Sequence, residues 1–318
     1  MSEAPSAPAH EAPAPRGAFA RALDSDVFWS FRRSPLTMAA AAITLLLVLA
    51  AVFAPLIAPQ NPFDPGQLDL FDSRLPPAWQ EGGDPRYLLG TDEQGRDVFS
   101  AILYGMRISL MVGVLGVLFA MLIGVTLGLM AGYLGGRVDG IIMRIADVQL
   151  TFPAILIALL IDGMAAGLFG RSGDTGSAVT VLVIAIALSF WVQYARTVRG
   201  STLVEINKDY VQAARLIGLS SFTIMWRHVL PNVTGPVLVI ATINLALAVI
   251  TEATLSFLGV GVPGTSPSLG TLIRIGNDFL FSGEWWITIF PGLTLAVLVL
   301  AVNLLGDWLR DALNPKLR

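Results

Sequence analysis

Residues Gly90 to Asp97, with the sequence GTDEQGRD, bring three acidic side chains and one arginine together between glycines. Crowded carboxylates are the ligands that a hard cation such as Ca²⁺ prefers. The acidic residues do not, however, follow the D-x-[DN]-x-[DN]-G spacing of a calcium loop. A turn held by its own charges is therefore the favoured interpretation, with a metal-binding loop as the alternative.

Other reactive side chains are scarce. The two lysines, Lys208 and Lys316, do not belong to a G-x-x-x-x-G-K-[ST] phosphate loop, which excludes hydrolysis of ATP by that route. The chain has no cysteine and only two histidines, His10 and His228, which excludes thiol chemistry and a multi-histidine metal centre. Neither HExxH nor GxSxG occurs, so we expect a protein that is not an enzyme.

The composition is that of a membrane protein. The chain of 318 residues is 54% hydrophobic and only 14% charged, and its mean hydropathy is +0.70. About 20 apolar residues in a helix cross the hydrocarbon core of a bilayer. We predict an all-α integral membrane protein with six transmembrane helices, at about 36–58, 108–133, 143–168, 177–197, 233–258 and 287–308.

The ends and loops of the chain suggest how it sits in the membrane. Residues 1–18, rich in Ala and Pro, predict a disordered tail, and 19–35 form either an interfacial helix or a basic flank. Most of the lysines and arginines fall in the two tails and in 134–146 and 195–232, whereas the loop 59–107 has an acidic excess. Because basic residues stay on the cytoplasmic side, we expect both termini to be cytoplasmic. The net charge of −3 gives no support for a nucleic-acid partner.

Three polar residues fall inside the apolar segments. Asp162 and Glu252 are costly in hydrocarbon unless they are paired or face water, which makes them candidates for a solute pathway. Asn244 is a third candidate. For Glu252 a structural hydrogen bond to a neighbouring helix is an equal alternative, and Asn244 is more typical of contacts between helices.

Residues 198–232 are too polar to cross a membrane, and their pattern predicts two short helices, at about 203–217 and 222–230. Gly218 suits the left-handed position after the first helix, Ser220 or Ser221 suits the cap of the second, and Pro231 is expected to end it. Small residues at Ala213 and Ala214 would let another surface approach closely. Apolar contacts with such a surface would come from Tyr210, Leu216, Phe222 and Trp226.

The run QAARLIGLSSFTIMWRHVLP within this segment resembles the EAA loop of binding-protein-dependent ABC importer permeases. The residues that match the pattern are Ala213, Ala214, Gly218, Leu230 and Pro231, while Gln212 replaces its Glu and His228 its Ile. The resemblance implies a coupling helix that docks on an ATP-binding subunit. The implied docking residues are Tyr210, Gln212, Ala213, Ala214, Arg215, Gly218, Leu230 and Pro231.

Two further stretches, LGTDEQGRDVFSAILYGMRISL (89–110) and the last two spans, resemble the C-type subunit of the dipeptide/oligopeptide permease family. This implies a fold of the type I ABC importer permease kind over 36–318, with an outer loop at 59–107 and a cytoplasmic coupling segment at 198–232. It also implies a location in the cytoplasmic (inner) membrane. The implied partners are a second, different permease subunit, two ATP-binding subunits and an extracytoplasmic substrate-binding protein.

The implied function is to form half of a translocation pathway for dipeptides, oligopeptides or similar small solutes. ATP and Mg²⁺ would be used by the partner subunits, with no cofactor bound by this chain. Relatives of the family also import nickel, glutathione and other small solutes, so these remain alternatives. A channel that works without ATPases, and a membrane enzyme with an outer pocket in 59–107, are further alternatives from other classes.

Overall fold

The computed structural model describes residues 31–169 and 174–312, and within these ranges the chain is helical throughout, apart from loops and one isolated β-bridge. Its α-helices are α3 (Pro35–Val52), α4 (Ala54–Ile57), α5 (Val98–Leu134), α6 (Gly136–Leu150), α7 (Ala154–Phe169), α8 (Thr175–Glu205), α9 (Asp209–Leu216), α10 (Ser221–Thr223), α11 (Leu230–Phe257), α12 (Leu269–Asn277) and α13 (Trp286–Ala312). Single turns are η1 (Pro65–Gln67), η2 (Leu70–Asp72), η4 (Leu280–Ser282) and the π-helical η3 (Ile224–Val229). The tail at 1–18 and most of 19–35 lie outside the described residues.

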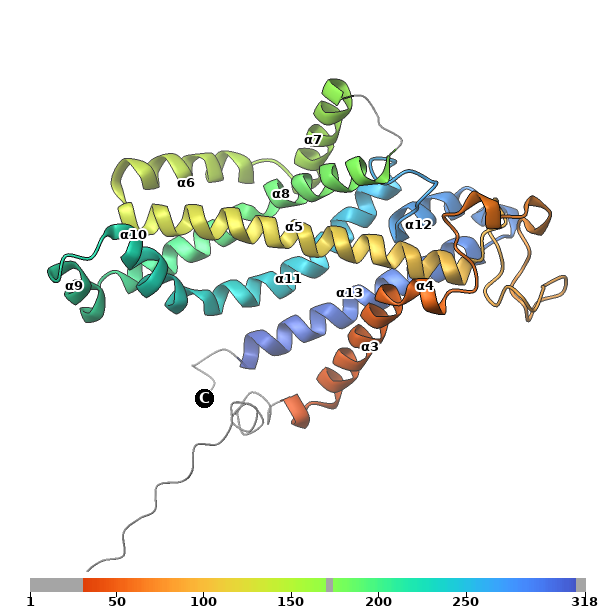
Figure 1. Ribbon diagram of the computed structural model, residues 1–318, viewed down its shortest axis with the longest axis horizontal. Coiled ribbons are helices and arrows are strands. Elements are labelled where there is room, and N and C mark those ends of the chain that lie inside the picture. Colours follow the sequence, from red (N-terminus) through yellow and green to blue (C-terminus); the bar gives the residue numbers. More distant parts are fainter. Residues whose placement is uncertain (1–30, 170–173, 313–318) are drawn as a thin grey trace, which may run out of the picture.

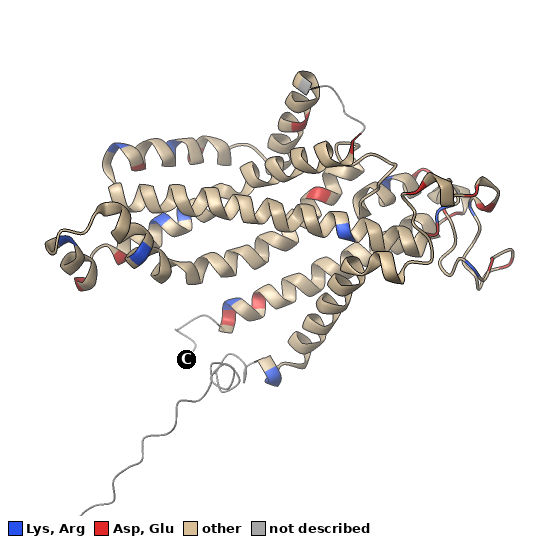
Figure 2. Ribbon diagram, viewed as in Figure 1, with Lys and Arg blue, Asp and Glu red and all other residues tan. Residues whose placement is uncertain are grey.

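The long helices form an elongated bundle (Figure 1). Helices α5, α8 and α11 pack against one another along its length, and α13 packs against α11 and α3. The loop 59–97 and α12 lie at one end of the bundle, and α9 and α10 lie at the other. Charged residues gather at these two ends, while the helices between them are largely uncharged (Figure 2). This is the arrangement that a bilayer around the middle of the bundle requires.

Five of the described helices are long and apolar enough to cross a membrane, and the number rises to six if the bent pair α6 and α7 is one span. The fold therefore agrees with an all-α protein of six spans. The bend between α6 and α7 is 95°, so residues 143–168 do not form the single straight helix that was predicted. The break falls at 151–153 because Pro153 disfavours the helical conformation at the residue before it.

Other boundaries also differ from prediction: the first span is divided into α3 and α4, and α8 extends to Glu205. Helix α5 begins at Val98 rather than at 108, because the Asp97 carboxylate caps it by accepting a hydrogen bond from the Ser100 amide over 2.9 Å. Helix α12 was not predicted. It is short and packs against α5, α11 and α13 at the end of the bundle that carries the loop 59–97.

The contact between α5 and α8 is the most extensive in the molecule, and it depends on glycines. A Cβ atom at Gly124 would lie 2.3 Å from the Trp191 carbonyl oxygen, and one at Gly128 would lie 2.4 Å from that of Ala195. Gly132 continues the same face toward Thr202. Small residues four apart allow membrane helices to approach at their backbones, as the G-x-x-x-G pattern predicts.

We predict that Gly128→Ala lowers the stability of the protein in detergent. An added Cβ would meet the backbone of α8, so the helices must separate, and overpacking of this kind costs about 1–3 kcal/mol. Gly292→Ala in α13 is the matched control, because a Cβ there meets no atom within 4 Å. Thermal unfolding of the two purified variants measures the difference. Equal midpoints would contradict close packing along this contact.

Candidate functional site

The end of the bundle that carries α9 and α10 is built as a turn between two short helices. Helix α8 continues to Glu205 and α9 begins only at Asp209, so the predicted helix 203–217 is interrupted at 206–208. Gly218 has a φ of +81°, the left-handed conformation that was expected after the first helix. The Ser220 hydroxyl accepts a hydrogen bond from the Thr223 amide over 3.2 Å and thereby caps the second helix.

Pro231 does not end that helix, contrary to prediction. The π-helical turn η3 leads directly into α11, and Pro231 lies in the first turn of α11. The hydrogen-bond register therefore changes from π to α beside Pro231, which has no amide hydrogen to donate. Leu230 is half-buried in the same turn, while Pro231 is exposed.

The Tyr210 hydroxyl ties this end of the bundle together. It donates to Glu205 Oε1 of α8 over 2.6 Å and accepts a hydrogen bond from Asn232 Nδ2 of α11 over 3.1 Å. Lys208 Nζ forms an ion pair with Glu205 Oε2 at 2.8 Å, and Asn232 also donates to the His228 carbonyl over 2.8 Å. Three helices are therefore joined through a single phenol.

Burial raises the pKa of Tyr210 to about 12, and the hydrogen bond to Glu205 acts in the same direction. The hydroxyl therefore stays protonated near neutral pH and remains a donor. Gln212 strengthens the same junction, because its side-chain amide donates to the Ile206 carbonyl over 3.0 Å. The polar residues between α8 and α11 thus satisfy one another and leave α9 in a fixed position.

Helix α9 has one face toward the bundle and one away from it. Ala214 and Val211 are buried against the bundle, and the Arg215 guanidinium lies 5.2 Å from the centre of the Tyr133 ring of α5. The opposite side is exposed, and it carries Ala213 and Leu216 together with Asp209. The exposed apolar tip, as we call it, consists of Leu216, Ile217 and Phe222, whose exposed fractions are 89%, 75% and 68%.

The predicted pathway residue Glu252 is fully buried inside the subunit. The Ser256 hydroxyl donates to Glu252 Oε1 over 2.7 Å, and the hydroxyls of Ser109 in α5 and Ser268 at the start of α12 lie around the same carboxyl group. The Leu269 amide of α12 donates to the Ser109 hydroxyl over 3.3 Å. This small polar cluster thus joins three helices.

The other two predicted pathway residues lie apart from Glu252. Asn244 is buried on α11 and faces the Tyr194 hydroxyl of α8. Asp162 is half-buried on α7. The structure therefore does not gather the three into one site.

The acidic turn Gly90–Asp97 is a structural junction. Arg96 and Asp92 are both buried, and the guanidinium Nε lies 2.6 Å from Asp92 Oδ2. Arg96 Nη1 also donates to the Gly264 carbonyl of the loop before α12 over 2.7 Å, and the Trp286 indole donates to the Thr91 carbonyl over 3.0 Å. No cluster of three or more metal-binding side chains occurs in the part of the chain that the structure describes.

Several residues of this architecture escaped the sequence analysis. Ile217 is the last residue of the predicted helix 203–217 and was not among the apolar contacts expected there. Glu205 and Asn232 were not singled out, because they are distant in sequence and become neighbours only through the turn. The contact between Glu205 and Tyr210 had one available signal in the sequence: an acidic residue at the end of one helix and a tyrosine at the start of the next.

Most of the chain matches the models of known protein families. Residues 124–318, more than half of it, match the family described as binding-protein-dependent transport system inner membrane component. Residues 25–77 match the N-terminal transmembrane domain of oligopeptide transport permease C. Together the two matches include the exposed apolar tip and the first described helix.

Similar proteins span nearly the whole chain. The di/tripeptide transport system permease protein DppC of Pseudomonas aeruginosa is 38% identical over 97% of this chain and 98% of its own length. The dipeptide transport system permease protein DppC of Escherichia coli K12 is 41% identical over 92% and 93%. In fold, the chain resembles a structure described as an inward-facing conformation of the MetNI methionine ABC transporter, with a TM-score of 0.53 and 19% identity over 67% of this chain and 96% of that one.

These matches agree with the helical bundle, with the resemblance in the coupling segment and with the absence of a phosphate-binding loop from the sequence. The chain is a non-catalytic, multi-pass component of the inner membrane, and ATP is hydrolysed by partner ATPases. It belongs to the family of binding-protein-dependent transport system inner membrane components and is a permease subunit of an ABC importer.

Proposed function

We propose that the chain forms half of the translocation pathway of an importer for dipeptides, tripeptides or short oligopeptides. The observation that carries the substrate class is the similarity to two peptide permeases of 38% and 41% identity, over more than nine-tenths of each chain. The other half is a different permease subunit, as the resemblance to the C-type subunit suggests. A substrate-binding protein delivers the solute at the outer face.

The segment 198–232 is the element that we propose to dock on an ATPase subunit. Its exposed apolar tip lies at the end of the bundle, beyond the apolar middle, where lipid does not cover it. An apolar patch in contact with water is typical of a surface that another protein covers. The polar junction at Tyr210 supports this role, since a docked helix transmits movement only if it is held firmly by its own bundle.

We place both termini on the cytoplasmic side. Helix α3 begins, and α13 ends, toward the end of the bundle that carries α9 and α10 (Figure 1). The distribution of basic residues supports the same orientation. In this arrangement the loop 59–97 and α12 lie outside, where a binding protein would meet them.

Among the predicted pathway residues, Asp162 has the accessibility that contact with a solute or another subunit needs. Glu252 and Asn244 are buried between helices, and we assign them to the packing of α11 against its neighbours. The pathway is then shared between faces of two subunits rather than enclosed by this chain. Side chains that are fully buried inside one subunit do not contact a passing peptide.

Reconstitution tests the substrate class. The tagged chain, purified in mild detergent with the proteins that accompany it and placed in liposomes with its binding protein, is expected to import a labelled dipeptide when ATP is supplied on the cytoplasmic side. Nickel and glutathione are the competing solutes. Import of either in preference to the dipeptide would overturn the peptide assignment, and dipeptide entry that does not need ATP would favour a channel.

Replacement of Ile217 by Asp is expected to release the ATPase subunits. A charge in the centre of an apolar contact is costly to bury, and hot-spot side chains of this kind are worth about 2 kcal/mol or more. Recovery of ATPase with the tagged chain should therefore fall by more than about tenfold. Phe71→Asp is the control, since Phe71 is 96% exposed in the outer loop. Equal recovery with both variants would count against docking through the tip.

Tyr210→Phe is expected to uncouple ATP hydrolysis from transport. It removes the hydroxyl that joins α8 to α11 and leaves Glu205 with one donor fewer, at a cost of about 1–3 kcal/mol. The ATPase subunits should still bind, but less peptide should enter for each ATP hydrolysed. Tyr133→Phe keeps the ring that faces Arg215 and should retain the normal ratio. An unchanged ratio in Tyr210→Phe would show that the junction is not needed for coupling.

A further inference from the structure

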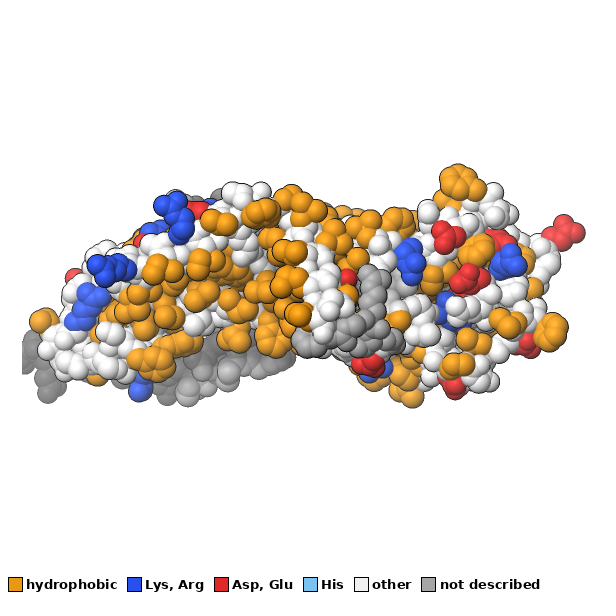
Figure 3. Space-filling model, turned by 90° about the horizontal axis from the view of Figure 1, so that it is seen from above, with side chains coloured by type: hydrophobic (Ala, Val, Ile, Leu, Met, Phe, Trp, Pro, Cys, Tyr) orange, Lys and Arg blue, Asp and Glu red, His pale blue; other side chains and the backbone are white. Residues whose placement is uncertain are grey.

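Helix α7 projects from the bundle. It turns away from α6 by 95° and packs mainly along α8, with a smaller contact to α11 (Figure 1). Much of its apolar surface is left open: Leu156, Leu160 and Met164 are 54%, 63% and 56% exposed. Hydrophobic side chains also spread over α6 beside it, between the charged ends of the molecule (Figure 3). The exposed apolar surface of α7 must therefore be covered by lipid or by another protein.

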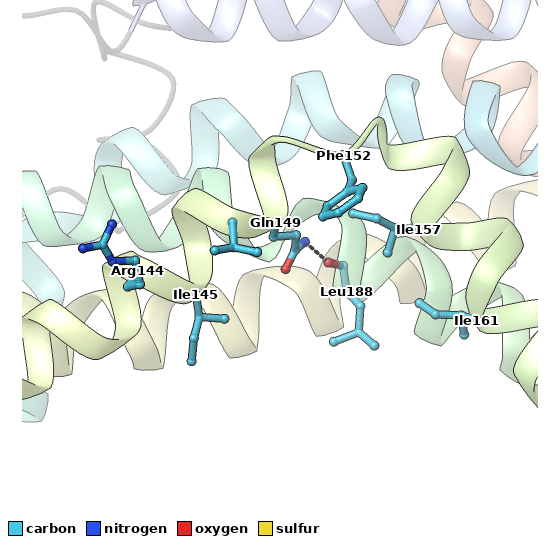
Figure 4. A pocket seen from close by; sticks show the side chains of 8 residues that line it. Arg144, Ile145, Gln149, Phe152, Ile157, Ile161 and Leu188 are labelled. Atoms are coloured by element: carbon cyan, nitrogen blue, oxygen red, sulfur yellow. Dashed lines mark hydrogen bonds between the residues drawn. The ribbon is translucent and has the colours of Figure 1, made fainter.

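The angle between α6, α7 and α8 encloses an open apolar groove of about 490 Å³ (Figure 4). The groove is lined by Arg144, Ile145, Val148, Gln149, Phe152, Ile157, Ile161 and Leu188. The Gln149 amide group donates to the Leu188 carbonyl, and its Oε1 accepts from the Trp191 indole over 2.6 Å. Because this amide is already paired, the remaining polar side chain of the groove is Arg144, and the other lining residues are apolar. The groove suits an apolar side-chain surface.

Both lipid acyl chains and an apolar protein surface could cover α7 and the groove. Asp162 indicates which of the two does so. It lies half-buried on α7, and no described residue forms a hydrogen bond or an ion pair with its carboxylate. A carboxylate within a transmembrane bundle is costly unless it is paired or faces water. Acyl chains carry no hydrogen-bond donor, whereas a protein helix brings one on a side chain. Water could also face the carboxylate, but water does not cover the exposed apolar side chains of Leu156, Leu160 and Met164 on the same helix. A protein helix supplies both a donor and an apolar surface, so we expect the occupant to be a protein.

We propose that α7 and the groove at its bend form the contact with the second permease subunit, and that a side-chain donor or cation of that subunit pairs with Asp162. The proposal rests on the proposed function, which already requires a second permease. It adds the surface through which the two halves meet. The contact joins the bundle through α8, the same helix that leads to the ATPase-docking segment.

Photo-crosslinking in membranes tests this contact. The chain has no cysteine, so Leu160→Cys provides a single site for a maleimide that carries a benzophenone. Irradiation should give an adduct between this chain and the second permease, identified by mass spectrometry. Leu300→Cys on α13 is the matched control, because Leu300 is 60% exposed. It should give that adduct severalfold less efficiently.

The outcomes separate this inference from the proposed function. If the second permease copurifies but Leu160→Cys yields no adduct with it, or no more than Leu300→Cys, the surface is wrong and the proposed function stands. If no second permease copurifies, the proposed function itself fails. An adduct with another copy of this chain would overturn the proposed occupant.

Charge reversal tests the pairing of Asp162. Asp162→Lys should reduce the amount of second permease recovered with the tagged chain by about tenfold, whereas Asp162→Asn, which keeps the shape and hydrogen-bonding capacity, should lose less. Asp278→Lys at the exposed end of α12 is the control for an added charge. Equal recovery with Asp162→Lys and Asp278→Lys would overturn the pairing. The crosslinking result holds even if Asp162→Lys fails to accumulate.

Discussion

Close backbone contact between α5 and α8 is the constraint on which the rest of the subunit depends. Burial of apolar surface does not drive helices together in lipid, so their association relies on packing and hydrogen bonds. The glycines of α5 supply that packing, because Gly124 and Gly128 leave room for the α8 backbone itself. Helices that meet at their backbones have little freedom to slide, and we infer that α5 and α8 move as one body.

The two ends of this body have different tasks. At one end, α5 begins from the acidic turn, where the buried ion pair of Arg96 and Asp92 holds the loop 59–97 and the loop before α12 in place. Removal of one partner from such a pair typically costs about 3–5 kcal/mol, because the other charge stays buried. At the opposite end, α8 passes into the junction of Glu205, Lys208 and Tyr210. We infer that a movement imposed on α9 is transmitted through α8 and α5 to the acidic turn.

Much of this architecture could be predicted from the sequence, because a bilayer imposes a length and a composition on whatever crosses it. The left-handed turn at Gly218 and the cap at Ser220 were also predictable, because each depends on one residue type at one position. Gly124 and Gly128 form a G-x-x-x-G pattern, which is typical of a close contact between membrane helices, but the pattern does not identify α8 as the partner.

What could not be predicted depends on neighbours that are distant in sequence. Pro231 was expected to stop a helix, but a π-helical turn before it removed the need for its missing amide hydrogen. Pro153 was expected near the start of the span 143–168, but its effect, a bend of 95°, requires a bundle that holds α7 away from α6. Helix α12 is short and mostly packed against protein, so it lacks the long apolar run by which membrane helices are found.

Polar side chains carry more information about the missing partners than apolar ones. Exposed leucines on α3, α7 and α13 can make favourable contacts with either lipid or protein, so they do not identify the partner. Charged side chains on the same bundle do not make favourable contacts with acyl chains. Asp162 on α7 needs a hydrogen-bond donor or water, and Arg107, exposed near the start of α5, needs an acceptor or water. The exposed faces of α5 and α7 are therefore the parts of this subunit whose surroundings only the assembled importer completes.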